Sequence, residues 1–163
     1  MMTDIRIGHG FDVHPFAPGR ELVIGGVRIE HDRGLEGHSD ADVLLHAIAD
    51  ALLGAAGLPD IGQHFPPTDR RYKDADSAEL LREVAGMIRR SGFKSLVNID
   101  SVIMADEPQM NPHIPAMKRR IAEVLDVSEK QVNVKATTCE GLGFVGRKEG
   151  IAASAVCLIS RNE

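Results

Sequence analysis

The sequence predicts an α+β fold in which helices pack on one face of a mixed β-sheet. Segments with strand-like alternation and segments with helical spacing of apolar residues are interspersed along the chain without strict alternation. The 163 residues are 43% hydrophobic and 26% charged, which suits one well-filled core and leaves too little chain for two ordinary domains. No repeat, low-complexity tract or linker interrupts the chain, so we expect one domain over residues 1–163.

The predicted strands begin near the N-terminus. The segment from Ile5 to His14 starts with alternating residues, and its glycines allow another backbone to approach closely. Gly25 and Gly26 then separate two short apolar segments, which predicts a hairpin. The hairpin strands are expected over 22–24 and 27–29, and further strands over 97–104, 132–138 and 151–159.

Three helices are predicted from apolar residues at helical spacing. Ser39 is the expected N-cap of the first, and Gly57 and then Pro59 end it. Prolines suit the start of the third helix, because a proline in the first turn sacrifices no hydrogen bond. The predicted helices run from Ser39 to Gly57, from Asp76 or Ser77 to Gly92, and from Pro112 to Leu125.

Composition excludes several kinds of partner. A net charge of −5, one Tyr, five Phe and no Trp argue against both a basic surface for nucleic acid and a stacking platform for its bases. No apolar run approaches the roughly 20 residues that span a bilayer, and Met1 to Arg6 lacks the apolar stretch of a signal peptide. Cys139 and Cys157 have no metal or redox spacing. We therefore expect a cytoplasmic protein without nucleic-acid or membrane partners.

The first chemical signal is a pair of metal-ligand residues in the first strand. Asp12 and His14 stand two residues apart, so both side chains leave the same face of an extended segment. One carboxylate and one imidazole on one face make half of a metal site. A D-x-H pair is weak by itself, because it arises often by chance.

The first helix carries a polar stripe at a spacing of four residues, formed by Asp42, His46 and Asp50. A solvated outer face is the ordinary explanation of such a stripe. The helix is otherwise so apolar, however, that the stripe is expected to face a partner, a metal or a cavity. If His46 meets Asp12 and His14, the three ligands leave a fourth position open, as in a catalytic zinc site. The alternative is a core histidine paired with a neighbouring aspartate.

Two further segments suggest phosphate binding. His38, Ser39 and Asp40 are expected at the N-terminus of the first helix, where free N–H groups hold phosphate, although Ser39 could serve as a cap alone. The segment from Lys135 to Glu140 ends a strand with a cation, hydroxyls and a carboxylate that could position a diphosphate and a second cation; a surface turn is the alternative. No Walker-type phosphate loop is present, and His31 is expected at the surface.

Four motifs occur in a familiar order. They are G-H-G-F-D-V-H at 8–14, H-S-D-A-D-V-x-x-H-A-x-x-D-A-L-L-G from His38, D-I-G at 60–62, and K-A-T-T-C-E-G-L-G-F-V-G-R at 135–147. Together they strongly resemble the 2-C-methyl-D-erythritol 2,4-cyclodiphosphate synthases of the non-mevalonate isoprenoid pathway, over essentially the whole chain. Some members carry a fused cytidylyltransferase domain, for which there is no room here, so we expect the single-function form.

The resemblance implies a phosphorus–oxygen lyase that acts on 4-diphosphocytidyl-2-C-methyl-D-erythritol 2-phosphate. The 2-phosphate attacks the β-phosphorus, CMP leaves, and a cyclic diphosphate forms. Asp12, His14 and His46 would bind Zn²⁺ or Mn²⁺, and Glu140 would reach a second cation, Mg²⁺ or Mn²⁺. His38 and Thr138 would stabilise the transition state. The further substrate contacts implied are Ser39, Asp60, Ile61, Gly62, Phe65, Pro66, Pro67, Thr68, Asp69, Ala105, Asp106, Glu107, Pro108, Gln109, Met110, Asn111, Thr137, Cys139, Phe144 and Arg147, together with Asp12, His14, His38, Thr138 and Glu140.

The resemblance also implies a bacterial homotrimer with active sites between subunits. A cavity on its three-fold axis, near Phe144, Arg147 and Glu149, could take an isoprenoid diphosphate. Two other functions remain open: a zinc-dependent phosphate-ester hydrolase that uses water as nucleophile, and a zinc-binding trimer without activity. The sequence departs from the commonest family pattern at Cys139, Val145, Arg70 and Asp74, which leaves the 65–75 loop and the nucleotide contacts less defined.

Overall fold

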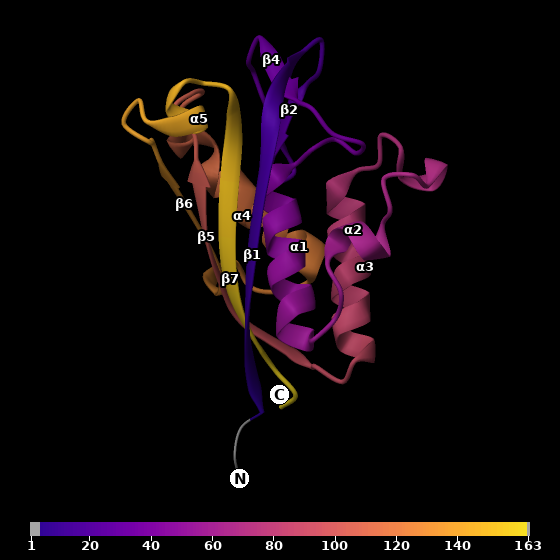
Figure 1. Cartoon of the computed structure of the whole chain (residues 1–163). Helices are drawn as coiled ribbons and strands as arrows, with labels where there is room; N and C mark the ends of the chain where they lie inside the picture. The colour runs from indigo at the N-terminus through magenta and orange to yellow at the C-terminus, as the bar shows by residue number, and fades with distance from the viewer. Residues whose placement is uncertain (1–3, 163) are drawn as a thin grey trace.

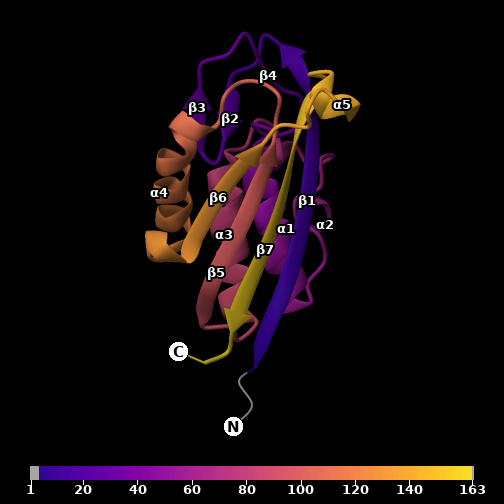
Figure 2. The same cartoon turned by 90° about the vertical axis from the view of Figure 1, so that its left-hand side faces the viewer.

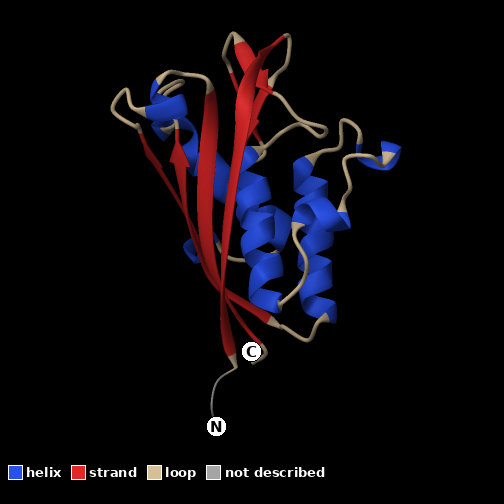
Figure 3. Ribbon diagram, viewed as in Figure 1, coloured by secondary structure: helices blue, strands red, loops and turns tan. Residues whose placement is uncertain are grey.

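The structure is a computed structural model that describes residues 4–162, so residues 1–3 and 163 of the predicted domain lie outside the described part. A five-stranded sheet is covered by helices, which confirms the α+β prediction (Figures 1 and 3). The strand order is β4-β1-β7-β5-β6, and the sheet is mixed because β5 and β6 are parallel whereas the other pairs are antiparallel.

The strands follow the prediction closely. The predicted hairpin is confirmed as β2 and β3, which form a separate two-stranded sheet. β1 continues past the predicted end at His14, because its last residues pair with β4, a short strand that the sequence pattern did not reveal. The strands are β1 (Ile5–Pro18), β2 (Leu22–Ile24), β3 (Val27–Ile29), β4 (Arg33–Leu35), β5 (Ser95–Met104), β6 (Val132–Thr137) and β7 (Gly150–Ser160).

The three long helices are also as predicted, apart from one boundary. Asp76 caps α3 through a hydrogen bond from the Ala78 N–H, and Pro115 lies in the first turn of α4. The helices are α1 (Val43–Ala56), α2 (Ile61–His64), α3 (Ser77–Arg90), α4 (Ile114–Leu125) and α5 (Gly143–Gly146), with 3₁₀ turns at Arg70–Tyr72, Asn111–His113 and Glu129–Gln131.

The predicted start of α1 at Ser39 is wrong. The N-cap is Asp42, whose carboxylate accepts a hydrogen bond from the Leu45 N–H at 3.0 Å. Ala41 has a left-handed φ of 57°, which interrupts the helical path between Ser39 and the first turn. The Ser39 hydroxyl instead accepts from the Ala41 N–H in a tight local turn. The segment from His38 to Asp40 therefore precedes the helix and is not part of its first turn.

The helices cover one face of the sheet and leave the other bare. Figure 2 shows the strands in front and α1 and α3 behind them. On the bare face, β1 exposes large apolar side chains; Ile7 is 69% exposed and Phe11 52%. Val156 of β7 is opposite His9 on the same face and is also exposed. Exposed large apolar side chains gathered on one face of a sheet indicate a candidate interaction surface.

The contact between β1 and α1 is unusually close. A Cβ atom on Gly8 would lie 1.8 Å from the Ala51 carbonyl oxygen, and one on Gly10 would lie 1.9 Å from that of Ala47. Neither glycine has room for any side chain, so the backbones of the strand and the helix are in direct contact. This contact fixes how far along the strand each turn of α1 lies, and it brings His46 beside Asp12.

We predict that Gly10→Ala destabilises the fold strongly, because the added methyl collides with main-chain atoms that only a shift of the whole helix can move. The loss should be at least about 1–3 kcal/mol in the free energy of unfolding. Gly54→Ala is the matched control within α1: its Cβ would meet nothing closer than 3.9 Å. That control should raise the stability by about 0.5–1 kcal/mol through helix propensity. Denaturant unfolding of both variants checks this; equal effects would show that the close contact is unimportant.

Candidate active site

The three predicted metal ligands converge at one point. The Asp12 Oδ2 atom lies 2.9 Å from the His14 Nε2 and 3.1 Å from the His46 Nδ1, and these two nitrogens are 3.3 Å apart. Asp12 and His14 come from the helix-facing side of β1, and His46 comes from the first turns of α1. Within residues 4–162 this is the cluster of His, Cys, Asp and Glu side chains that meets the geometry of a metal site.

The arrangement fits a divalent metal ion. Bonds of about 2.0–2.1 Å in a tetrahedral site place the ligand atoms about 3.3 Å apart, close to the separations found here. The second nitrogen of each imidazole has its own partner: the His14 Nδ1 lies 2.7 Å from the Glu36 carbonyl oxygen, and the His46 Nε2 lies 2.9 Å from the Ser77 hydroxyl. The Nδ1–H of His14 must donate to that carbonyl, which leaves its Nε2 lone pair free for a metal.

The electrostatics keep this cluster ready for a cation. Burial acts to raise the pKa of Asp12, but hydrogen bonds and charges from His14 and His46 outweigh it and lower the pKa to about 2. Burial likewise acts to lower the pKa of His14, and the Asp12 carboxylate outweighs it, so the net shift is upward. The carboxylate is therefore ionised at neutral pH, and a bound cation would compete with protons for the His14 imidazole.

The other two members of the polar stripe on α1 hold neighbouring segments in place. The Asp42 carboxylate accepts hydrogen bonds from the N–H groups of Gly25 and Gly26, and so ties the β2–β3 turn to the start of α1. Burial, helped by the charge of Asp40, raises the pKa of Asp42 to about 6 despite these bonds. Asp50 accepts from the Ile61 N–H at 2.7 Å, and its pKa is raised by burial. The prediction that each stripe residue faces a partner is confirmed.

A cavity of about 240 Å³ opens beside the metal ligands. It brings together many of the predicted substrate-binding residues from the start of α1, the turn at α2 and the loop that follows. Its lining is Asp12, His14, His38, Ser39, His46, Ile61, Gly62, Phe65, Pro67, Tyr72 and Leu80. Tyr72 was missed by the sequence analysis. It packs edge-on against Phe65, with ring centroids 5.2 Å apart, and an aromatic residue in a polar loop is the only signal that could have indicated it.

The remaining predicted residues around this cavity are held by local hydrogen bonds. The carboxylate of Asp60 caps α2 by accepting from the N–H of Gln63, which orients the turn that contains Ile61 and Gly62. The His38 Nε2 lies 3.2 Å from the carbonyl oxygen of Asp69, so the 65–69 loop is connected to the segment before α1. Asp60, Pro66, Thr68 and Asp69 support the cavity without lining it.

The predicted nucleotide-binding residues form a second group at the ends of β5 and β6. Asp106 accepts hydrogen bonds from the N–H groups of Cys139 and Gly141, at 2.8 and 3.3 Å, which joins the 105–111 loop to the turn after β6. The Thr138 hydroxyl donates to the Glu140 carboxylate at 2.8 Å. None of the described residues 105–111 and 137–140 lines the cavity at the metal ligands.

Charged residues fix the position of the 105–111 loop. Glu107 forms ion pairs with Arg33 and Lys148, each at 2.8 Å, and these lower its pKa. His31 faces the same carboxylate at 3.8 Å, and only 15% of its side chain is exposed, so the prediction of a surface histidine is wrong. Phe144 and Arg147, predicted near an axial cavity, are exposed, and Arg147 pairs with Glu149.

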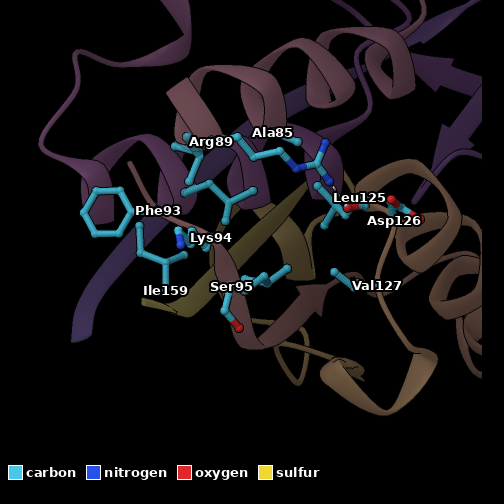
Figure 4. A pocket seen from close by; sticks show the side chains of 12 residues that line it. Ala85, Arg89, Phe93, Lys94, Ser95, Leu125, Asp126, Val127 and Ile159 are labelled. Carbon is cyan, nitrogen blue, oxygen red and sulfur yellow. Dashed lines mark hydrogen bonds between the residues drawn. The ribbon is translucent and has the colours of Figure 1, made fainter. Parts of the chain in front are cut away.

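Another cavity lies at the opposite end of the helical layer, where α3 and α4 end and β5 begins (Figure 4). It holds about 90 Å³ and is lined largely by apolar side chains, among them Phe93, Leu125 and Ile159. The guanidinium of Arg89 donates to the Leu125 carbonyl oxygen and so closes one side of it. None of its lining residues belongs to the candidate metal site, which lies beside the other cavity.

Fold and site together define an α+β protein with a candidate metal site beside a cavity of about 240 Å³. The chain belongs to the YgbB family, whose model matches residues 5–160. The proteins named 2-C-methyl-D-erythritol 2,4-cyclodiphosphate synthase from Moorella thermoacetica and Halalkalibacterium halodurans are 61% and 62% identical to it. The first alignment covers 98% of this chain and 97% of the relative, and the second covers 95% and 98%. The family expected from the motifs is thereby confirmed.

Solved structures give the same result. The structure of the bifunctional IspDF protein from Campylobacter jejuni matches with a TM-score of 0.93 at 47% identity, over 98% of this chain. The match spans only 43% of that protein, so this chain corresponds to less than half of its length. The CDP complex of IspF from Plasmodium falciparum matches with a TM-score of 0.84 at 32% identity, over 98% of both chains. Over residues 4–162, no helix has the length and apolar character needed to cross a membrane.

We predict that His46→Ala removes tight binding of added zinc and leaves the fold largely intact. Two ligands cannot fix the geometry of an open site, whereas alanine is the best helix former. His113→Ala, which replaces a histidine outside the cluster, should keep the zinc. Metal content per chain and thermal melting are measured on the same samples. A His46→Ala protein that melts early yet retains its full zinc would show that His46 is only structural.

Proposed function

We propose that this chain converts 4-diphosphocytidyl-2-C-methyl-D-erythritol 2-phosphate to 2-C-methyl-D-erythritol 2,4-cyclodiphosphate and CMP. The observation that carries the proposal is the convergence of Asp12, His14 and His46 at a cavity that also contains His38 and Ser39. The relatives that share the fold are named for this product. A cation site beside hydrogen-bond donors is what a reaction between two phosphates requires.

The reaction needs no activated side chain of the protein. An oxygen of the 2-phosphate forms a new bond to the β-phosphorus, the bond from that phosphorus to the bridging oxygen breaks, and CMP leaves with the bridging oxygen. Because nucleophile and leaving group belong to one substrate, positioning them supplies much of the rate enhancement. The protein must hold the chain of the substrate bent, with both phosphates at one point, and neutralise their charge.

The residues divide this work between them. Asp12, His14 and His46 would hold a divalent cation, Zn²⁺ or Mn²⁺, which would supply positive charge beside the phosphates. His38 and Ser39 lie in the same cavity and offer hydrogen bonds to the phosphate. Thr138 would stabilise the transition state from the nucleotide side, and Glu140 would hold a second cation, Mg²⁺ or Mn²⁺. A protein of net charge −5 can bind this anionic substrate because the cations bring the positive charge.

The two ends of the substrate would contact the two groups of residues separately. Asp60, Ile61 and Gly62, with the 65–69 loop, would hold the erythritol part beside the metal ligands, whereas residues 105–111 and 137–140 would hold the cytidine diphosphate. Since the second group does not line the cavity of its own chain, a complete site needs the nucleotide-binding group of a second subunit.

A homotrimer would complete the site. The bare apolar face of the sheet, with Ile7, Phe11 and Val13 of β1 exposed, supplies a surface for packing against other subunits. Its three-fold axis would pass near Phe144, Arg147 and Glu149, and an isoprenoid diphosphate is the ligand that an apolar cavity with a guanidinium there would suit. The exposed sheet face and the divided site thus support the same assembly.

The product distinguishes this function from its competitors. We predict that phosphorus NMR of the substrate incubated with enzyme and divalent cation shows a cyclic diphosphate and CMP. A hydrolase that uses the same metal site with water would give linear phosphates, and a metal-binding protein without activity would leave the substrate unchanged. Either of these results would refute the cyclase.

The assembly is tested at Phe11. We predict that Phe11→Lys dissociates the trimer, because three lysines cannot be buried together without partners, and that activity falls with it. Phe11→Leu keeps an apolar side chain there and should remain trimeric. Light scattering gives the mass of each variant. An unmodified protein that is fully active and has the mass of a monomer would contradict a site shared between subunits.

A further inference from the structure

The nitrogen of His46 that points away from the metal site is held by a chain of two residues from other parts of the fold. The Nε2 atom lies 2.9 Å from the Oγ of Ser77, the first residue of α3. The hydroxyl of Ser77 in turn donates to the Oδ1 atom of Asp40, in the segment before α1. Ser77 is only 1% exposed, so water does not compete for its hydroxyl. The Asp40–Ser77–His46 chain therefore runs from a carboxylate to a proposed metal ligand.

The directions of these hydrogen bonds follow from the number of protons available. An ionised carboxylate only accepts, so the single hydroxyl proton of Ser77 goes to Asp40. The Ser77 oxygen is then free to accept from the His46 Nε2 at 2.9 Å, which places the imidazole proton on Nε2. We infer this direction, and not a hydrogen bond from the Ser39 hydroxyl to Nε2, because only a ring protonated on Nε2 leaves Nδ1 free for a metal. A neutral imidazole carries one N–H, so the Nδ1 atom of His46 is left with a free lone pair. That lone pair faces Asp12 at 3.1 Å, where the metal ion would lie.

We propose that Asp40, acting through Ser77, is a positioning residue that fixes His46 in the tautomer able to bind the metal. The inference rests on the proposed metal site and assigns a role to two residues outside it. Buried hydrogen bonds behind a ligating histidine orient the ring and select its tautomer, and they affect metal affinity without touching the metal.

Asp40 is held firmly enough to serve this purpose. Its Oδ2 atom accepts from the Ser77 N–H at 3.1 Å, its Oδ1 also accepts from the Asp42 N–H at 3.2 Å, and its own N–H donates to the Ala75 carbonyl. The carboxylate thus receives hydrogen bonds from the starts of both α1 and α3. One side chain fixes the relative position of the two helices that supply His46 and Ser77.

The same arrangement leaves the proton of Ser39 available to the substrate. The Ser39 Oγ lies 3.2 Å from the His46 Nε2 and accepts from the Ala41 N–H at 3.2 Å. If Nε2 carries the proton, Ser39 is its second acceptor and need not donate to it. The hydroxyl proton of Ser39 is then free to turn toward the cavity that this residue lines. The Asp40 carboxylate would thus set both the tautomer of His46 and the availability of the Ser39 hydroxyl proton for a phosphate.

The test is Asp40→Asn, which keeps the shape of the side chain and replaces one acceptor with a donor. The amide has a single oxygen, whereas the carboxylate accepts from the N–H groups of both Ser77 and Asp42, so the amide nitrogen must face one of these two donors. With the oxygen kept at the Ser77 N–H, the nitrogen faces the Ser77 oxygen and donates to it. Ser77 then has to donate to the His46 Nε2, which moves the imidazole proton to Nδ1 and blocks the metal. We expect zinc affinity to fall by about 10–100-fold. Ser77→Ala removes the middle member of the Asp40–Ser77–His46 hydrogen-bond chain. It should weaken zinc binding by a factor at the lower end of that range.

Asp76→Asn is the matched control. Like Asp40→Asn, it replaces a carboxylate with an amide at the start of α3, where Asp76 caps the helix by accepting from the Ala78 N–H. Unlike Asp40, Asp76 does not accept from the Ser77 hydroxyl. Zinc affinity is measured by competition with a chromophoric chelator, and the position of the His46 imidazole proton by ¹⁵N NMR of the zinc-loaded protein. The parent and Asp76→Asn should show the proton on Nε2, and Asp40→Asn at the same zinc concentration should show it on Nδ1.

Three results would overturn the proposal: a parent protein with the proton on Nδ1, an Asp40→Asn protein with unchanged tautomer and zinc affinity, or a control that loses as much affinity as Asp40→Asn. Both measurements are made without substrate, so they do not depend on which reaction is catalysed. A parent that binds zinc with the expected tautomer but forms no cyclic product would refute the proposed function and leave this inference standing.

Discussion

The direct contact between the backbones of β1 and α1 is the constraint on which the rest of the molecule depends. Gly8 and Gly10 leave no side chain between the strand and the helix, so Ala47 and Ala51 lie against the strand. The glycines occupy the same face of β1 as the two ligands that follow them. Once the helix is seated on this face, its next turn places His46 opposite Asp12, and a metal site forms without any separate loop to build it. The precision of the site thus comes from main-chain packing.

The polar stripe on α1 shows that functional polar side chains on a buried helix carry a desolvation penalty. Each polar side chain that is taken out of water needs a partner, and each has one: backbone N–H groups for Asp42 and Asp50, and the ligand cluster for His46. The compensation for Asp42 is incomplete, because its pKa is about 6 and its ionised form is therefore less stable in the folded protein than in water. The hydrogen bonds of Asp42 and Asp50 attach the β2–β3 hairpin and the α2 turn to the same helix that carries the candidate ligand His46.

Much of the fold and the centre of the site can be predicted from the sequence because they follow local periodicity. The two-residue spacing of Asp12 and His14 predicts that both ligands share one face of a strand, and the four-residue spacing around His46 predicts a polar stripe on a helix. That the two meet depends on the contact between β1 and α1. Other features depend on contacts between distant segments. The cap of α1 moved from Ser39 to Asp42 because of a left-handed residue between them, and the role of Ser77 depends on where α3 starts relative to α1. No pattern in the sequence shows that the nucleotide-binding residues lie apart from the metal ligands.

X-ray absorption at the zinc edge of the zinc-loaded protein tests the proposed metal ligands directly. Scattering from two imidazole rings, with nitrogen and oxygen neighbours at about 2.0–2.1 Å, is the predicted result. Replacing His46 with alanine should remove one imidazole from that shell or abolish the bound zinc. Sulfur neighbours at about 2.3 Å, or a shell of oxygens without imidazole, would contradict the site formed by Asp12, His14 and His46.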